Sequence, residues 1–106
     1  MGLFDFLRGY DINAGVEEQR AVNGSLLVDV RTEEEYQSGH ITGSKNIPLH
    51  AIDKISSATE NKSTPLYLYC CSGDRSRQAA AAVQRMGYRN VKNIGGICAW
   101  QGKVER

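Results

Sequence analysis

Cys70 stands where an apolar, strand-like run ends and an alanine-rich helical pattern begins. The first four N–H groups of a helix lack intrahelical partners, and the helix dipole adds partial positive charge there. A sulfur at such a place is biased towards the thiolate, which is the nucleophilic form, and the same N–H groups can hold an anion. We therefore expect Cys70 to be a catalytic nucleophile with a substrate-binding loop behind it. The residues of that loop are Cys71, Ser72, Gly73, Asp74 and Arg75.

Three residues of this loop have expected roles of their own. Gly73 lets the backbone adopt a positive φ and approach a bound group closely. Asp74 suits the N-cap position of the helix that follows. Arg75 can attract anions, whereas the Asp74 carboxylate opposes them.

The composition is that of one small globular domain. A chain of 106 residues with 41% hydrophobic and 24% charged residues can bury a core and keep a polar exterior. The formal net charge of +1 gives no electrostatic basis for binding nucleic acid or an acidic membrane surface. No apolar run approaches the length that spans a bilayer. We expect a monomer without a nucleic-acid or membrane partner.

The three cysteines, two of them adjacent, do not form a disulfide framework. The apolar residues 1–7 are too few and too acidic for a signal peptide, so we expect the reducing cytoplasm, where thiols stay free. The histidines and cysteines lack zinc-like spacing, and no metal or other cofactor is expected. Cys71 is either a passive loop residue or a resolving thiol. Cys98, close to Trp100, is expected in or near the core.

Helical and strand-like patterns alternate along the chain. Thr32 and Glu35 have the spacing of a capping box, and Leu26–Val30 is the continuous apolar run of a strand buried on both faces. After an irregular N-terminal extension over 1–15, the pattern predicts helices over 16–22, 32–39, 49–55 and 75–86, strands over 26–30, 66–69 and 91–94, and a surface loop over 56–63. This order is typical of an α/β domain with a mostly parallel sheet, which we place at 16–106.

Two of the predicted strands end in chemically active residues. Asp29 and Arg31 close the first strand, and Cys70 closes the next. Ligands of open parallel sheets bind outside the carboxyl ends of the strands, so we expect both groups at one rim of the sheet. Asp29 and Arg31 are expected to form an ion pair that supports this rim.

Short segments in a fixed order resemble the single-domain members of the rhodanese-like (thiosulfate:cyanide sulfurtransferase) family. They cover about residues 26 to 101, and the ordered set is far more specific than any one segment. The matching segments are Leu27–Arg31, Glu35-Tyr36, Gly39–Ser44, Asn46–Leu49, Tyr69–Ser76, Gly87-Tyr88, Val91, Gly95–Ile97 and Ala99-Trp100. The resemblance implies a three-layer α/β domain, in which helices flank a central, mostly parallel sheet.

The resemblance also implies that Cys70 takes up sulfane sulfur as a persulfide. Cys70–Arg75 would form a six-residue loop whose N–H groups surround the sulfur. Family members often carry Arg where Cys71 stands, and a basic or neutral residue where Asp74 stands. Both departures reduce the local positive charge and disfavour tight binding of free thiosulfate. The implied partners are a small sulfur-containing anion or persulfide as donor and a thiol or protein as acceptor.

Two other functions fit parts of the same sequence. Cys71 and Arg77 have the spacing of the cysteine, five residues, arginine pattern of tyrosine phosphatases and arsenate reductases. However, Cys70 follows the strand directly, and a loop counted from Cys70 is too tight for a phosphate. A non-catalytic binding module with the same fold is the third hypothesis, which the presence of Cys70 disfavours. Sulfur transfer is the leading interpretation.

Overall fold

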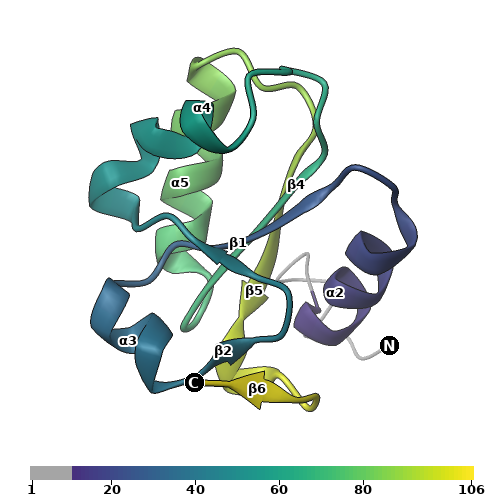
Figure 1. The fold of residues 1–106 in the computed structure, drawn as a ribbon, viewed down its shortest axis with the longest axis vertical. Coiled ribbons are helices and arrows are strands. Elements are labelled where there is room, and N and C mark those ends of the chain that lie inside the picture. The colour runs from purple at the N-terminus through teal and green to yellow at the C-terminus, as the bar shows by residue number, and fades with distance from the viewer. Residues whose placement is uncertain (1–10) are drawn as a thin grey trace.

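The computed structural model describes residues 11–106 and shows an α/β domain built on a parallel four-stranded sheet (Figure 1). The strand order is β3-β1-β4-β5, and each neighbouring pair is parallel. A separate antiparallel pair joins β2 to β6. The expected fold class, a mostly parallel sheet flanked by helices, is confirmed. The strands are β1 (Leu26–Asp29), β2 (His40–Ile41), β3 (Lys45–Asn46), β4 (Leu66–Cys70), β5 (Val91–Gly96) and β6 (Val104–Glu105).

Helices cover both faces of the sheet and complete three layers. Figure 1 shows α2 on one side of the strands and α5, with α4 beside it, on the other. The helical segments are α2 (Ile12–Ala21), α3 (Glu33–Ser38), the 3-10 segment η1 (Leu49–Lys54), α4 (Ile55–Ala58), α5 (Asp74–Arg85) and the 3-10 turn η2 (Ile97–Ala99). None of the helices within residues 11–106 combines the length and the apolar character needed to cross a bilayer.

The central strand β4 separates the two halves of the core, and all five of its residues are buried. Leu68 belongs to the cluster that contains Val83 of α5, whereas Tyr67 belongs to the cluster that contains Val16 of α2. Successive side chains of a strand point to opposite faces, which is why this strand is apolar throughout. Cys70 follows Leu68 by two residues and therefore lies on the α5 face, where it joins the same cluster.

The helix α3 begins at the predicted capping box. The Thr32 hydroxyl accepts a hydrogen bond from the Glu35 N–H at 3.2 Å, and the Glu35 carboxylate accepts one from the Thr32 N–H at 3.0 Å. The helix ends at Ser38, and Gly39 follows it, as the sequence indicates. This places Glu35 at a fixed position near the carboxyl rim of the sheet, where it has a second partner described below.

The predicted start of the first helix at residue 16 is wrong. Asp11 caps α2 by accepting the Asn13 N–H at 3.0 Å, and Ile12 is buried in the core. Residues 12–15 are therefore helical as well, because the Asp11 cap and the buried Ile12 side chain outweigh the glycine at position 15. The rest of the expected irregular extension, residues 1–10, lies outside the described residues.

The predicted surface loop over 56–63 is also too long. The helix α4 extends through Ala58, since Ile55 is fully buried and anchors one more helical turn. The helix predicted over 75–86 is present as Asp74–Arg85, so each of its ends lies one residue earlier than predicted. Gly87 follows with a φ of 106°, the left-handed conformation expected just beyond a helix end.

Candidate active site

Cys70 ends β4 at the carboxyl rim of the sheet, and hydrogen-bond donors surround its sulfur. The residue is 1% exposed. The Gly73 N–H donates to Sγ at 3.0 Å, and the N–H and the hydroxyl of Ser76 each donate to it at 3.4 Å. Gly73 has the predicted positive φ, 106°. This turn brings the N–H groups at the start of α5 around the sulfur.

These donors govern the ionisation of the Cys70 thiol. Burial raises its pKa, but hydrogen bonds from the hydroxyl and N–H of Ser76 and from the N–H groups of Gly73 and Ser72 outweigh burial. The pKa of Cys70 therefore lies below the ordinary value of a thiol. Hydrogen bonds to the charged form favour that form. The surroundings of the buried Cys70 sulfur thus favour the thiolate form more than water does for an ordinary thiol.

Asn93 of β5 supports the loop from the opposite side. Its Nδ2 donates to the Gly73 carbonyl at 3.1 Å, and its Oδ1 accepts from the Ser76 hydroxyl at 2.7 Å and from the Gly95 N–H at 3.0 Å. The Ser76 hydroxyl has one proton to donate, so Asn93 Oδ1 at 2.7 Å, the Gly73 carbonyl at 3.2 Å and Cys70 Sγ at 3.4 Å compete for it. Sequence reasoning missed both Asn93 and the Ser76 hydroxyl. For Asn93, the one signal in the sequence was an amide side chain inside a predicted strand.

Arg75 points to α3 and forms an ion pair with Glu35. Its two terminal nitrogens lie 2.7 and 3.1 Å from the two carboxylate oxygens. This hydrogen bonding holds the pKa of Glu35 at about 2. The hydrogen bond and the charge of Glu35 also raise the pKa of Arg75, although burial opposes that increase. The loop was expected to offer the Arg75 guanidinium to anions, but this guanidinium is already paired with Glu35.

Asp29 and Arg31 form the predicted ion pair beneath the rim. Arg31 Nη2 lies 2.8 Å from Asp29 Oδ2 and donates to the Gly39 carbonyl at 2.6 Å. Burial lowers the pKa of Arg31, but the hydrogen bond and charge of Asp29 outweigh burial and raise it. Asn46 Nδ2 donates to the carbonyls of both Asp29 and Arg31 at 3.0 Å. The pair thus connects the end of β1 to the residues that precede β2.

The prediction that Asp74 caps α5 is wrong. The N-cap is Gly73, whose left-handed conformation starts the helix at the next residue, and no side chain caps this end. Asp74 is instead the exposed first residue of the helix. A carboxylate at this position still interacts favourably with the helix dipole. Asp74 therefore lies four residues after Cys70 with its side chain exposed.

The prediction that Cys98 lies in or near the core is also wrong. Gly96 ends β5, and the η2 turn that follows places Cys98 at the surface. Its Sγ lies 3.0 Å from Cys71 Sγ. That hydrogen bond, together with burial, raises the pKa of Cys71. Within residues 11–106, no group of three or more His, Cys, Asp or Glu side chains is placed to hold a metal ion.

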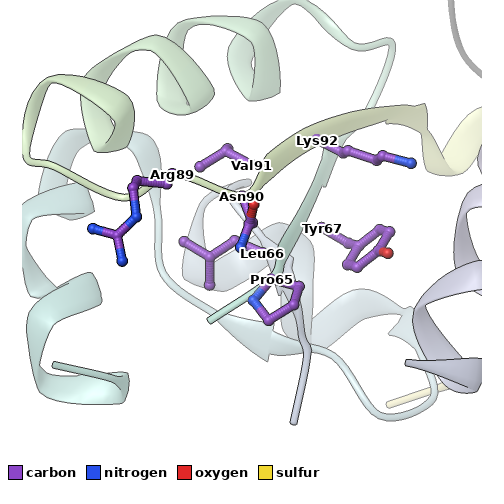
Figure 2. A pocket seen from close by; sticks show the side chains of 7 residues that line it. All are labelled: Pro65, Leu66, Tyr67, Arg89, Asn90, Val91 and Lys92. Atoms are coloured by element: carbon purple, nitrogen blue, oxygen red, sulfur yellow. The ribbon is translucent and has the colours of Figure 1, made fainter. Parts of the chain in front are cut away.

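A separate pocket, whose lining side chains Figure 2 shows, lies at the other end of the sheet. Pro65, Tyr67, Arg89 and Lys92 are among the residues that line it. These residues lie at or next to the amino ends of β4 and β5. Parallel sheets bind their ligands at the carboxyl ends of the strands, and this pocket contains no thiol or carboxylate. The Cys70 loop is therefore the candidate active site.

Comparison with known proteins identifies the family of this chain and agrees with its fold. The model of the rhodanese-like domain matches residues 12–103. The chain belongs to the rhodanese-like domain family. A solved structure described as rhodanese with anions from Escherichia coli superposes on this rhodanese-like domain with a TM-score of 0.72 and 34% identity. That alignment covers 77% of this chain and 98% of the solved one.

Two relatives of this rhodanese-like domain carry sulfurtransferase names. Thiosulfate sulfurtransferase PspE of Escherichia coli is 39% identical over 71 residues, which are 66% of this chain and 68% of that protein. Adenylyltransferase and sulfurtransferase uba4 of Ogataea parapolymorpha is 34% identical over 96 residues. These are 90% of this chain but only 25% of that protein, so the chain spans a quarter of the length of this relative.

Ser76→Ala should raise the pKa of Cys70, because the variant loses the hydroxyl donor but keeps the N–H donor. The pH midpoint of Cys70 alkylation by iodoacetamide should move upwards, as followed by fragment-ion mass spectrometry that distinguishes Cys70 from Cys71. Ser72→Ala is the matched control, since it keeps the backbone N–H through which Ser72 acts on the sulfur. Equal midpoints in the two variants would show that the Ser76 hydroxyl does not stabilise the thiolate.

Asp29→Ala should destabilise the protein by about 3–5 kcal/mol, because it leaves the buried Arg31 guanidinium without a counter-charge. Lys92→Gln is the control, since it breaks an exposed pair with Glu18 of 2.6 Å while the Tyr67 hydroxyl keeps its acceptor on Glu18, and it should leave the free energy of unfolding nearly unchanged. Urea unfolding followed by circular dichroism measures both. A loss in Asp29→Ala no larger than that in the control would contradict a supporting role for the buried pair.

Proposed function

We propose that this rhodanese-like domain is a sulfurtransferase that moves sulfane sulfur from a donor to a thiophilic acceptor through a persulfide on Cys70. The observation that carries the proposal is the buried Cys70 sulfur, surrounded by donors from Gly73 and Ser76 that lower its pKa. A thiol that ionises before the substrate arrives needs no separate general base. This favours a reactive role for Cys70 over a fold kept only for binding.

The reaction has two displacements on sulfur. The Cys70 thiolate attacks the sulfane sulfur of the donor, and the donor S–S bond breaks. The electron pair leaves with sulfite when the donor is thiosulfate, or with a thiolate when the donor is a persulfide. An acceptor thiolate then attacks the outer sulfur of the Cys70 persulfide, and the Cys70 thiolate leaves. The N–H groups of Gly73 and Ser76 stabilise negative charge on sulfur in both displacements.

The named relatives support the class of reaction. PspE is named a thiosulfate sulfurtransferase, and the uba4 name includes sulfurtransferase. Because the chain spans only a quarter of the uba4 length, the adenylyltransferase part of that name is not extended to it.

The surroundings of Cys71 favour Cys70 as the nucleophile. A phosphatase or arsenate reductase of the pattern considered above would need Cys71 as a thiolate within a ring of N–H groups. Instead, Cys71 Sγ lies 3.0 Å from Cys98 Sγ, and this hydrogen bond and burial raise the pKa of Cys71. The N–H donors of the loop bond the sulfur of Cys70.

The charges near Cys70 favour a persulfide donor over free thiosulfate. Arg75 is paired with Glu35, so its charge is largely compensated. Asp74 adds an exposed carboxylate at the start of α5. Thiosulfate carries two negative charges and is opposed by this carboxylate more strongly than a less charged donor. The acceptor is proposed to be a thiol, either a small molecule or a protein side chain.

Cys70→Ser should abolish persulfide formation, because serine has no sulfur to attack the donor. Intact-protein mass spectrometry after incubation with thiosulfate or a small persulfide should show a gain of one sulfur atom in the wild type, which cyanide removes. Cys98→Ser is the matched control and should keep the gain. Retention of the cyanide-sensitive sulfur in Cys70→Ser would refute the proposed function.

Asp74→Asn should lower the KM for thiosulfate roughly two- to fivefold at low ionic strength, because it removes a like charge worth about 0.3–1 kcal/mol. Salt should reduce the gain, since the carboxylate is exposed. The variant should also lose about 0.3–1 kcal/mol of stability, because an acidic group leaves the first turn of α5.

Glu60→Gln is the charge-matched control for this measurement, since Glu60 is exposed in the loop that precedes the amino end of β4. Its KM for thiosulfate should stay at the wild-type value. If Asp74→Asn and Glu60→Gln change the KM equally, net charge and not the position of Asp74 determines the affinity.

A further inference from the structure

Cys71 and Cys98 form a second pair of thiols beside the Cys70 loop. Their Sγ atoms lie 3.0 Å apart, and both cysteines are free. Cys71 opens the loop after β4, whereas Cys98 lies in η2 after β5. The fold therefore brings together two thiols that are 27 residues apart in the sequence.

The backbones that carry these thiols are already in contact. The Cys98 N–H donates to the Cys71 carbonyl at 3.3 Å. Gly96 permits a still closer approach, because a Cβ at that position would lie 2.0 Å from the Cys71 carbonyl oxygen. A disulfide has an S–S length near 2 Å, so the sulfurs need to move together by only about 1 Å. No rearrangement of the sheet is required.

The pair can be reached from solvent through Cys98. Cys98 is exposed and Cys71 is half-buried, whereas Cys70 is 1% exposed. A small reagent therefore meets Cys98 first, and Cys71 is placed behind it as the resolving thiol. Cys70 is a poor partner for Cys71, because a disulfide between adjacent residues strains the peptide that joins them. The Cys70 sulfur is also occupied by the donors of Gly73 and Ser76.

We propose that Cys71 and Cys98 are a redox-active dithiol that low-molecular-weight disulfides convert to an intramolecular disulfide while Cys70 stays reduced. The Cys98 thiolate attacks one sulfur of the reagent, whose S–S bond breaks, and a first thiolate leaves. Cys71 then loses its proton to solvent and attacks Cys98 Sγ, and a second thiolate leaves. The dithiol loses two electrons and two protons, and the reagent disulfide is reduced to two thiols.

This redox site is independent of sulfur transfer, because Cys70 takes no part in the exchange. The new bond would fix the residue that follows Cys70 to η2. The disulfide would not involve Gly73 or Ser76, whose hydrogen bonds lower the pKa of Cys70. The oxidised protein should therefore keep Cys70 open to alkylation.

The test uses oxidised glutathione on the full chain, followed by an acid quench, alkylation and digestion with trypsin. In the wild type, the peptides 63–75 and 93–103 should become linked, and the number of alkylated cysteines should fall from three to one. Because peptide 63–75 contains both Cys70 and Cys71, Cys70→Ser identifies the linked residue and should keep the link. That variant also tests the dithiol in the absence of the proposed persulfide site.

Single serine variants complete the test. Cys71→Ser and Cys98→Ser should each lose the link and accumulate glutathione on the remaining thiol of the pair. Loss of the link in Cys70→Ser would overturn the proposal, since it would assign the link to Cys70 and Cys98. Glutathione adducts without any link in the wild type would also overturn it, because they would show that the two thiols do not react together.

Discussion

A sulfur that must carry negative charge where water hardly reaches it depends on the protein for stabilisation. Cys70 is in this position, and the groups that bond its sulfur are N–H and hydroxyl donors of Gly73 and Ser76. Among the described residues, no charged side chain has a hydrogen bond to this sulfur. A thiolate at Cys70 is thus stabilised by fixed dipoles at the start of α5, which in this buried site are screened less by salt than exposed charged groups and are not lost by titration.

Fixed dipoles act only if the backbone that carries them cannot turn away, and two contacts provide that restraint. Asn93 of β5 holds the Gly73 carbonyl, and Arg75 of α5 is paired with Glu35 of α3. The loop is therefore anchored to a strand on one side and a helix on the other. This arrangement is the preorganisation that catalysis on sulfur would need.

The sequence predicted those features that depend on neighbours along the chain. The apolar run of β4, the capping box of α3 and the positive φ of Gly73 are set by local residue types, and all three are present. Features that depend on residues far apart in sequence were not predictable. Asn93 reaches the loop through an irregularity in the pairing of β5 with β4, and Cys98 lies at the surface because η2 turns there. The partner of Arg75 is 40 residues away.

The ion pair between Glu35 and Arg75 determines at which pH the Arg75 guanidinium is free to meet an anion. The pKa of Glu35 is lowered to about 2 by the hydrogen bond from Arg75, so the pair contributes stability above the ordinary pKa of a glutamate and loses it as pH falls towards 2. Exposure of about a third of each side chain keeps that contribution modest. Near neutral pH Arg75 is therefore paired, so the hydrogen bonds to the Cys70 sulfur come from N–H and hydroxyl groups, and under the proposed function the exposed Asp74 carboxylate disfavours a donor with two negative charges.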